Sequence, residues 1–124
     1  MKELTKAEEQ LMQIIWEIKQ GFVNDFLDHM EEPKPAYNTV STIVRILEKK
    51  GFVGYIAYGK THQYYPLISK EDYRKELMGG VVKNYFSNSF QQLASFFAEG
   101  KQLSLKELEE LRIIVDKEIN MHKK

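Results

Sequence analysis

A change of hydrophobic period at Gly51 constrains the fold of this chain more than any other feature of its sequence. Before Gly51, four apolar residues follow the i, i+3, i+4, i+7 spacing of one helix face: Val40, Ile43, Val44 and Leu47. After it, residues 52–58 and 61–65 are rich in aromatic and β-branched side chains, and Gly59-Lys60 separates them. This pattern predicts a helix over residues 37–50 followed by a β-hairpin with a two-residue turn.

The opposite face of the predicted helix carries donors, small hydroxyls and positive charge, and no carboxylate: Asn38, Ser41, Thr42, Arg45 and Lys49. Such a face suits the major groove of DNA, which admits a helix and is read by short polar and cationic side chains. It also fits an ordinary amphipathic helix whose polar face meets solvent. The helix alone leaves both interpretations open.

Charge is distributed unevenly along the chain. The formal net charge of the 124 residues is zero, so the total gives no support to nucleic-acid binding. Residues 34–60, however, contain five Lys or Arg against Glu48 alone, and they follow an acidic segment over residues 24–32. A basic segment beside an acidic one indicates a polarised surface, which is weaker evidence for a nucleic-acid partner than a high pI.

Several classes of protein are excluded by what the sequence lacks. The absence of cysteine excludes disulfides, thiolate metal sites and a cysteine nucleophile. The isolated His29, His62 and His122 form no metal-binding pattern, and no glycine-rich phosphate loop is present. We therefore expect no cofactor, no metal and no enzymatic activity. Without a signal peptide or a long apolar run, the sequence predicts a cytoplasmic protein with no membrane insertion.

The segment before residue 37 has the pattern of two further helices. Thr5 and Glu8 have the spacing of a capping box, and Gly21 is expected to end the first helix in the left-handed conformation. Apolar residues of the second helix are again at i, i+3, i+4 and i+7: Val23, Phe26, Leu27 and Met30. Three helices and a hairpin are the order of a winged helix-turn-helix domain, whose third helix is presented to the groove.

The rest of the chain is predicted to be helical and unusually apolar. Ser69 offers an N-cap, Gly79-Gly80 a break or kink, and Ser104 with Glu107 a second capping box. We expect these helices to bury apolar residues against a second copy, in a homodimer: Val82, Tyr85, Phe86, Phe90, Leu93, Phe97, Leu108, Leu111 and Val115. The alternative is that they fold back on the first domain.

The predicted fold class is mainly α with a small β-hairpin. It comprises a winged helix-turn-helix DNA-binding domain over residues 1–68 and a C-terminal helical dimerisation domain over residues 69–124. Four stretches in this order resemble the penicillinase-repressor family of winged-helix regulators: 4–8 with 15–17, 37–51, 64–67 and 103–112. The resemblance covers nearly the whole chain.

This resemblance implies a dimeric transcriptional repressor on a double-stranded DNA operator with an inverted repeat, upstream of β-lactamase or related genes. In the family a membrane sensor-protease responds to a β-lactam, and the repressor is then cut in its C-terminal half. The matching bond here is Phe96-Phe97, although family examples carry Asn before the Phe. Both phenylalanines also fit a role as dimer core. The resistance repressors of the family carry basic residues at the positions that match Asn38 and Ser41, so their operator sequence does not transfer.

Contacts to DNA are expected to divide into base reading and phosphate positioning. Asn38, Ser41 and Thr42 would reach base edges, with Thr39 at the edge of the same face. Four cationic side chains would contact phosphates: Arg45, Lys49, Lys50 and Lys60. His62 of the wing would assist them. The competing hypothesis is a winged-helix module that docks a protein and never touches DNA.

Overall fold

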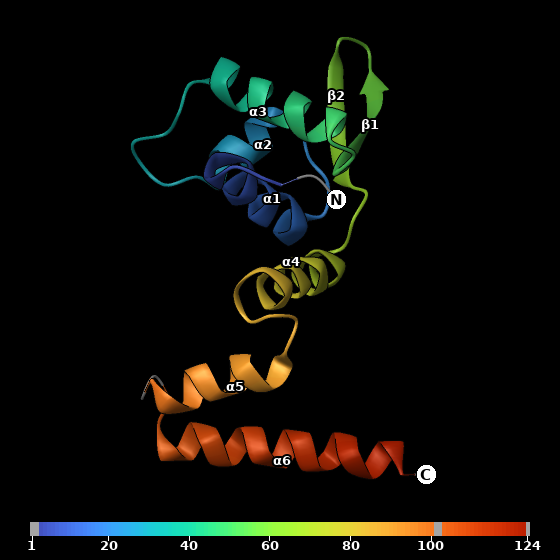
Figure 1. Ribbon diagram of the computed structural model, residues 1–124. Coiled ribbons are helices and arrows are strands. Elements are labelled where there is room, and N and C mark those ends of the chain that lie inside the picture. Colours follow the sequence, from blue (N-terminus) through green and yellow to red (C-terminus); the bar gives the residue numbers. More distant parts are fainter. Residues whose placement is uncertain (1–2, 101–102, 124) are drawn as a thin grey trace. The chain divides into compact units, whose positions relative to one another are not determined.

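The computed structural model describes residues 3–100 and 103–123 and divides the chain into two compact units, Met1–Glu76 and Leu77–Lys124. Figure 1 shows the elements in chain order. They are α1 (Lys6–Ile18), α2 (Val23–Asp28), α3 (Tyr37–Lys49), β1 (Val53–Tyr58), β2 (Thr61–Pro66), α4 (Lys70–Tyr85), α5 (Phe90–Glu99) and α6 (Leu105–His122). The predicted order of three helices, a hairpin and further helices is confirmed.

Helix α1 begins where the sequence predicts. The Thr5 hydroxyl accepts from the Glu8 amide, and the Glu8 carboxylate accepts from the Thr5 amide, each at 3.2 Å. This reciprocal capping box satisfies two of the amides that a helix start leaves unpaired. Helix α2 starts in a similar way, because Asp25 Oδ2 accepts from the Phe22 amide at 2.8 Å.

The first unit is built around one apolar core shared by α1, α2, α3, the hairpin and the first turn of α4. Its largest fully buried side chains come from all of these elements except α4: Leu11, Met12, Ile15, Phe26, Val40, Val44, Leu47, Phe52 and Val53. The predicted inward face of α3 is confirmed, with Ile43 half-buried at its edge. Burial of that face fixes which side of α3 remains outside.

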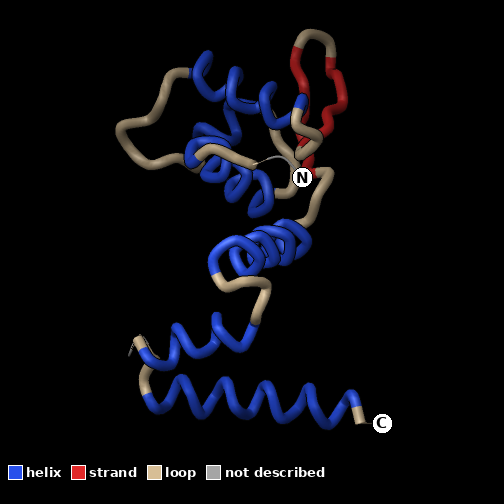
Figure 2. The backbone as a smooth tube through the Cα atoms, viewed as in Figure 1, coloured by secondary structure: helices blue, strands red, loops and turns tan. Residues whose placement is uncertain are grey.

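The hairpin follows α3 after a left-handed turn at Gly51, whose φ is +84°. Strands β1 and β2 form an antiparallel hairpin, drawn in red in Figure 2, and its register pairs Val53 with Pro66 through Tyr58 with Thr61. Gly59 and Lys60 therefore form a two-residue turn, and Gly59 has a φ of +62°. Glycine at the first position of such a turn accepts the positive φ without steric cost.

Two expectations about glycines are wrong. Helix α1 ends at Ile18, and its C-cap Lys19 takes the positive φ of +73°. Gly21 lies in extended backbone that exchanges hydrogen bonds with Tyr64 of β2 at 3.0 and 2.8 Å. Gly79 and Gly80 do not break α4, which runs unbroken to Tyr85. The break comes instead at Ser87 and Asn88, both with positive φ, between α4 and α5.

The start of α4 belongs to the core of the first unit. Ser69 caps the helix by accepting from the Asp72 amide at 3.0 Å, as predicted. One turn later Tyr73 is buried between the rings of Trp16 and Phe52, and its hydroxyl donates to Glu9 at 2.9 Å. The expected boundary between residues 68 and 69 remains a prediction, but the first turn of α4 packs with the residues before it.

The second unit consists of the rest of α4 with α5 and α6. Helix α5 is capped by Ser89, and α6 by the predicted capping box of Ser104 and Glu107. Among the described residues of this unit, Val82 is the only buried apolar side chain. No helix in the described part of the chain is both long enough and apolar enough to cross a bilayer.

Candidate nucleic-acid interface

The outward face of α3 is exposed along its whole length. Asn38, Thr39, Thr42, Arg45 and Lys49 are exposed, and Ser41 is half-buried at the side nearest the hairpin. These residues lie opposite the buried Val40, Val44 and Leu47. The sequence therefore placed the polar face correctly, and a mostly polar and cationic surface, which also includes the exposed Ile46, is open to a partner.

The hydroxyl of Thr42 is already engaged within the helix. Its Oγ1 donates to the Asn38 carbonyl at 2.9 Å, which is the common back-bond of threonine to the residue four positions earlier. The proton of Thr42 is therefore used, while its oxygen lone pairs and methyl group remain available. Thr42 can accept from a base amino group or contact a thymine methyl, but it is a poorer donor than Ser41.

The hairpin adds a second group of polar side chains beside α3. Lys60 is exposed at the tip of the turn, where the chain reverses. His62 is half-buried, and its ring stacks on Tyr55 across the hairpin at a centroid distance of 4.1 Å and an angle of 7°. Tyr58 packs its ring against Phe22 at 5.8 Å. The wing is thus held by aromatic packing, and Lys60 is free to reach outward.

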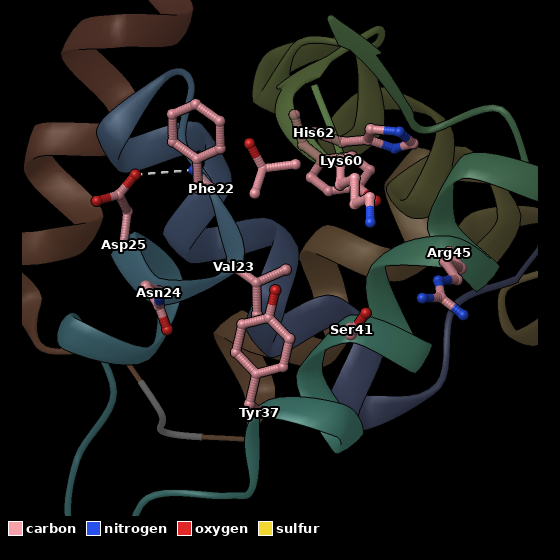
Figure 3. Close-up of a pocket in the computed structure, with 11 residues that line it drawn as sticks. Phe22, Val23, Asn24, Asp25, Tyr37, Ser41, Arg45, Lys60 and His62 are labelled. Atoms are coloured by element: carbon pink, nitrogen blue, oxygen red, sulfur yellow. Dashed lines mark hydrogen bonds between the residues drawn. The ribbon is translucent and has the colours of Figure 1, made fainter. Parts of the chain in front are cut away.

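A cavity of about 400 Å³ lies between α2, the first half of α3 and strand β2. Figure 3 shows Tyr37, Ser41 and Arg45 entering it from α3, and Lys60 and His62 from the wing. Asp25 is the carboxylate in its lining, and one of its oxygens is occupied by the Phe22 amide. Two cations and several hydroxyl and ring donors on one side make the cavity suited to an anionic group.

Tyr37 is a lining residue that the sequence prediction did not include. It is the first residue of α3, and Ala36 before it provides no side-chain cap. Tyr37, Ser41 and Arg45 are spaced at i, i+4 and i+8, which puts them on one line of the helix facing the wing. That spacing was the available signal. The predicted contact surface begins at Asn38 and therefore leaves Tyr37 out.

Lys50 lies apart from the other predicted phosphate contacts. Its ammonium donates to Glu8 Oε1 at 2.5 Å and to the Glu3 carbonyl at 2.9 Å, and its side chain is 22% exposed. The neighbouring Lys49 is exposed on the outward face. The structure thus brings together Arg45, Lys60 and His62 at the cavity, with Lys49 further along α3, and leaves Lys50 on the opposite side of the helix end.

The predicted dimerisation residues fall into three groups by exposure. Val82 is fully buried within the single chain, so its side chain is not part of the exposed surface. Phe86, Leu93 and Leu108 are half-buried. The others are exposed in the single chain: Tyr85, Phe90, Phe97, Leu111 and Val115. Further apolar side chains of α6 are exposed as well: Leu105, Ile113, Ile114, Ile119 and Met121.

The candidate cleavage pair lies in the last half of α5. Phe96 is 53% exposed and Phe97 is 37% exposed. The two rings contact each other edge to face at 5.6 Å, and Phe96 also contacts Phe86 at the same distance. Within the described residues, no cluster of histidines and carboxylates could hold a metal ion.

Comparison with known proteins gives a consistent result. The family model described as "Penicillinase repressor" matches residues 4–117 of the chain. The "Methicillin resistance regulatory protein MecI" of Staphylococcus aureus (strain N315) is 31% identical over 116 residues, which cover 93% of this chain and 94% of that protein. The "Penicillinase repressor" of Bacillus licheniformis is 24% identical over 122 residues, covering 98% and 95% of the two chains.

A solved structure supports the fold of the first unit. The solution structure of the DNA-binding domain of the repressor BlaI is similar with a TM-score of 0.50 and 26% identity. The similarity covers 59% of this chain and 94% of that domain. The predicted winged helix-turn-helix fold is therefore confirmed, and the helices α5 and α6 confirm that the C-terminal part is helical.

Proposed function

The chain belongs to the penicillinase repressor family of transcriptional regulators, which are not enzymes, and we propose that it represses transcription as a homodimer bound to a two-fold symmetric DNA operator. In this proposal α3 of each copy lies in the major groove and the wing lies against the backbone. The observation that carries it is the outward face of α3, which is exposed, polar and cationic and contains no carboxylate.

Base edges are read from the first two turns of α3. Asn38 can pair bidentately with adenine through its amide, and Ser41 can donate to or accept from several bases. Thr42 serves as an acceptor and a methyl contact because its proton is used by the Asn38 carbonyl. Thr39, at the edge of the face, meets either a base or a sugar-phosphate. These short side chains require close approach of α3 to the groove floor.

Phosphates are held by the cations around the same face. Arg45 and Lys60 line the cavity between α3 and the wing, where Tyr37 and His62 add ring donors. A backbone phosphate seated there would be held from the helix and from the hairpin together. Lys49 lies one turn beyond Arg45 and reaches the next phosphate along the strand. Such contacts fix the register of the protein on DNA but carry no sequence information.

The first experiment is a footprint of the purified protein on the DNA upstream of its own gene. We expect protection of an inverted repeat whose half-sites are separated by one helical turn, about 34–36 Å, or by a multiple of it. Absence of protection at low salt would overturn the proposal. Gel shifts on operator variants then separate the two kinds of contact. We expect Arg45→Ala to weaken binding to all sequences, and Ser41→Arg to change the preferred sequence.

Salt dependence distinguishes this function from a protein-docking module. A protein that neutralises phosphates loses affinity steeply as salt rises, because bound counterions are released from the DNA. A winged-helix module that binds only protein through the same face gives no such slope with DNA. A flat salt dependence in the wild-type chain would favour the docking module.

The homodimer is supported by the second unit, whose exposed apolar side chains have no core of their own. Monomeric proteins rarely expose so many neighbouring apolar groups without a partner. A second copy is a partner that offers the same surface, and two-fold symmetry then matches an inverted repeat. Sedimentation of the full chain should give the mass of a dimer at micromolar concentration.

Release from the operator is proposed to follow cleavage of the Phe96-Phe97 bond by a membrane sensor-protease that responds to a β-lactam. The exposure of both rings supports access to this segment. Cleavage would remove α6 from the rest of the chain and so weaken the dimer. The regulated genes would be those of β-lactam resistance, as the names of the relatives indicate, and the repressor would act in the cytoplasm. Exposing cells to a β-lactam should yield a fragment ending at Phe96, and an intact chain would contradict this step.

A further inference from the structure

The C-terminal end of α3 is tied to the start of α1 by a shielded ion pair. The Lys50 ammonium donates to Glu8 Oε1 at 2.5 Å and to the Glu3 carbonyl at 2.9 Å. The side chain of Glu8 is 7% exposed and that of Lys50 is 22% exposed. Glu8 Oε1 also accepts from the Thr5 amide, so one carboxylate joins the cap of α1 to the end of α3.

Glu8 is ionised in this arrangement. Burial raises the pKa of Glu8, but the hydrogen bonds from Lys50 and from the amide and hydroxyl of Thr5, with the charge of Lys50, outweigh burial and lower it below its usual value. A buried carboxylate that lost its cation would remain charged in apolar surroundings, which is costly. The pair therefore resists separation, and the end of α3 cannot shift without breaking it.

Lys50 and the neighbouring Lys49 lie in different surroundings. Lys49 points from the outward face, whereas two of the three ammonium protons of Lys50 are used on α1 and the segment before it. Recognition by short side chains such as Asn38 and Ser41 depends on a fixed approach of α3 to the groove. A tether at the far end of a rigid helix controls that approach.

We propose that Glu8 and Lys50 are positioning residues for DNA recognition, which fix the angle of α3 on the three-helix core and make no contact with DNA themselves. The inference rests on the proposed function and replaces the sequence-based assignment of Lys50 to a phosphate. The two assignments predict opposite signs for one substitution. If Lys50 binds phosphate, Glu8→Gln frees its ammonium and removes a negative charge, so DNA affinity rises. If the pair positions α3, the same substitution lowers affinity.

The experiment measures DNA affinity against salt for the full-length protein on the footprinted operator. Gln at residue 8 retains the capping-box acceptor, so Glu8→Gln removes the charge of the pair and keeps the cap of α1. We expect Glu8→Gln and Lys50→Gln each to lower DNA affinity by about tenfold, which lies within the range of interaction free energies for residues of one network. The dependence of affinity on salt should stay unchanged. The double variant should lose no more than either single one, and Lys50→Arg should retain most of the affinity.

Two control variants separate this role from charge and from general stability. Lys49→Gln should lower affinity and reduce the salt slope by about one, as the loss of a phosphate contact requires. Tyr73→Phe removes a hydrogen bond between α4 and Glu9 of α1 that involves neither Glu8 nor Lys50, and it should lower the unfolding midpoint without changing DNA affinity.

Three results would overturn the inference. The first is tighter binding by Glu8→Gln, and the second is a salt slope reduced by about one in Lys50→Gln. The third is a lower unfolding midpoint in both variants with unchanged affinity, which would make the pair a purely structural contact. If the wild-type chain binds no DNA at any salt concentration, the proposed function fails and the inference falls with it. Each of the first three results leaves the proposed function standing.

Discussion

The two units of this chain bury their apolar residues to very different extents. The first unit has a continuous core of twelve buried residues drawn from three helices, the hairpin and the start of α4. The described part of the second unit buries Val82 alone, although α5 and α6 are rich in Phe, Leu, Ile and Val. Both units use the same kind of helix cap, Thr5 with Glu8 in one and Ser104 with Glu107 in the other.

The difference teaches that local signals form helices in both units, but only one unit completes a core within a single chain. Capping and periodicity act over three to seven residues and are alike in the two halves. A core needs surfaces from several elements that enclose one another. The first unit can therefore present α3 as a rigid face, whereas most apolar side chains of α5 and α6 remain exposed within a single chain.

Loss of a core side chain should have the largest effect on the free energy of unfolding, and this effect should differ between the two units. Phe26 is fully buried and packs near Tyr64, so Phe26→Ala should lower the free energy of unfolding of the first unit by about 3–5 kcal/mol. Urea unfolding followed by the fluorescence of Trp16, the chain's one tryptophan, reports this unit. Phe90→Ala, at a site 70% exposed, is the control and should change that transition by less than about 0.5 kcal/mol. Equal losses in both variants would contradict the comparison.

A charge on the exposed surface of α6 should act on association instead of unfolding. Leu111 is 45% exposed in the single chain. Leu111→Asp should raise the dimer dissociation constant by about 100-fold, because burying an unpaired carboxylate in the interface costs more binding free energy than losing an ordinary contact. Sedimentation over a range of concentrations measures the constant. Asn120→Asp adds the same charge at an exposed polar position of α6 and serves as the control. An unchanged dimer in Leu111→Asp would remove this face from the interface.

A hydrogen bond at the start of α4 should contribute a smaller amount. Tyr73→Phe should lower the free energy of unfolding of the first unit by about 1 kcal/mol, because Glu9 loses its donor. Burial and the bond to Glu9 raise the pKa of Tyr73 to about 12. The folded pKa lies above the unfolded one, so this stability is complete below about pH 10 and is lost as pH rises through 12. The gap between wild type and Tyr73→Phe should close over that window, and Tyr85→Phe, at an exposed tyrosine, should show no gap at any pH.

The two capping boxes provide the smallest and most direct test of the comparison. The pKa of Glu8 is lowered because hydrogen bonds from Lys50 and Thr5 outweigh the effect of burial, and bonds from Ser104 lower the pKa of Glu107. Since both folded values lie below the unfolded ones, the stability is present above the unfolded pKa and is lost as pH falls through the folded pKa. We expect Glu8→Gln to reduce the acid dependence of Trp16-monitored unfolding, and Glu107→Gln to leave it unchanged. A larger change in acid dependence for Glu107→Gln than for Glu8→Gln would show that the shielding of Glu8 from solvent does not affect stability in acid.

Much of the exposed polar face of α3 could be predicted because it depends on helix geometry alone. Once Val40, Val44 and Leu47 face inward, Asn38, Thr42, Arg45 and Lys49 must face outward. The hairpin turn at Gly59-Lys60 was predictable for a similar reason, because register follows from the two-residue turn. The cavity beside Tyr37 was not predicted, since it requires the wing to stand next to the first half of α3.

The sequence by itself determined the order of the helices, the caps at Thr5, Ser69 and Ser104, the hairpin and the polar face of α3, because each depends on residues less than about ten positions apart. Only the tertiary structure decided where α1 ends, whether Gly79-Gly80 interrupts α4, and what Lys50 contacts. Gly21 is committed to Tyr64 and Lys50 to Glu8, partners 43 and 42 positions away. Contacts of that range depend on how whole elements pack, which no local pattern records.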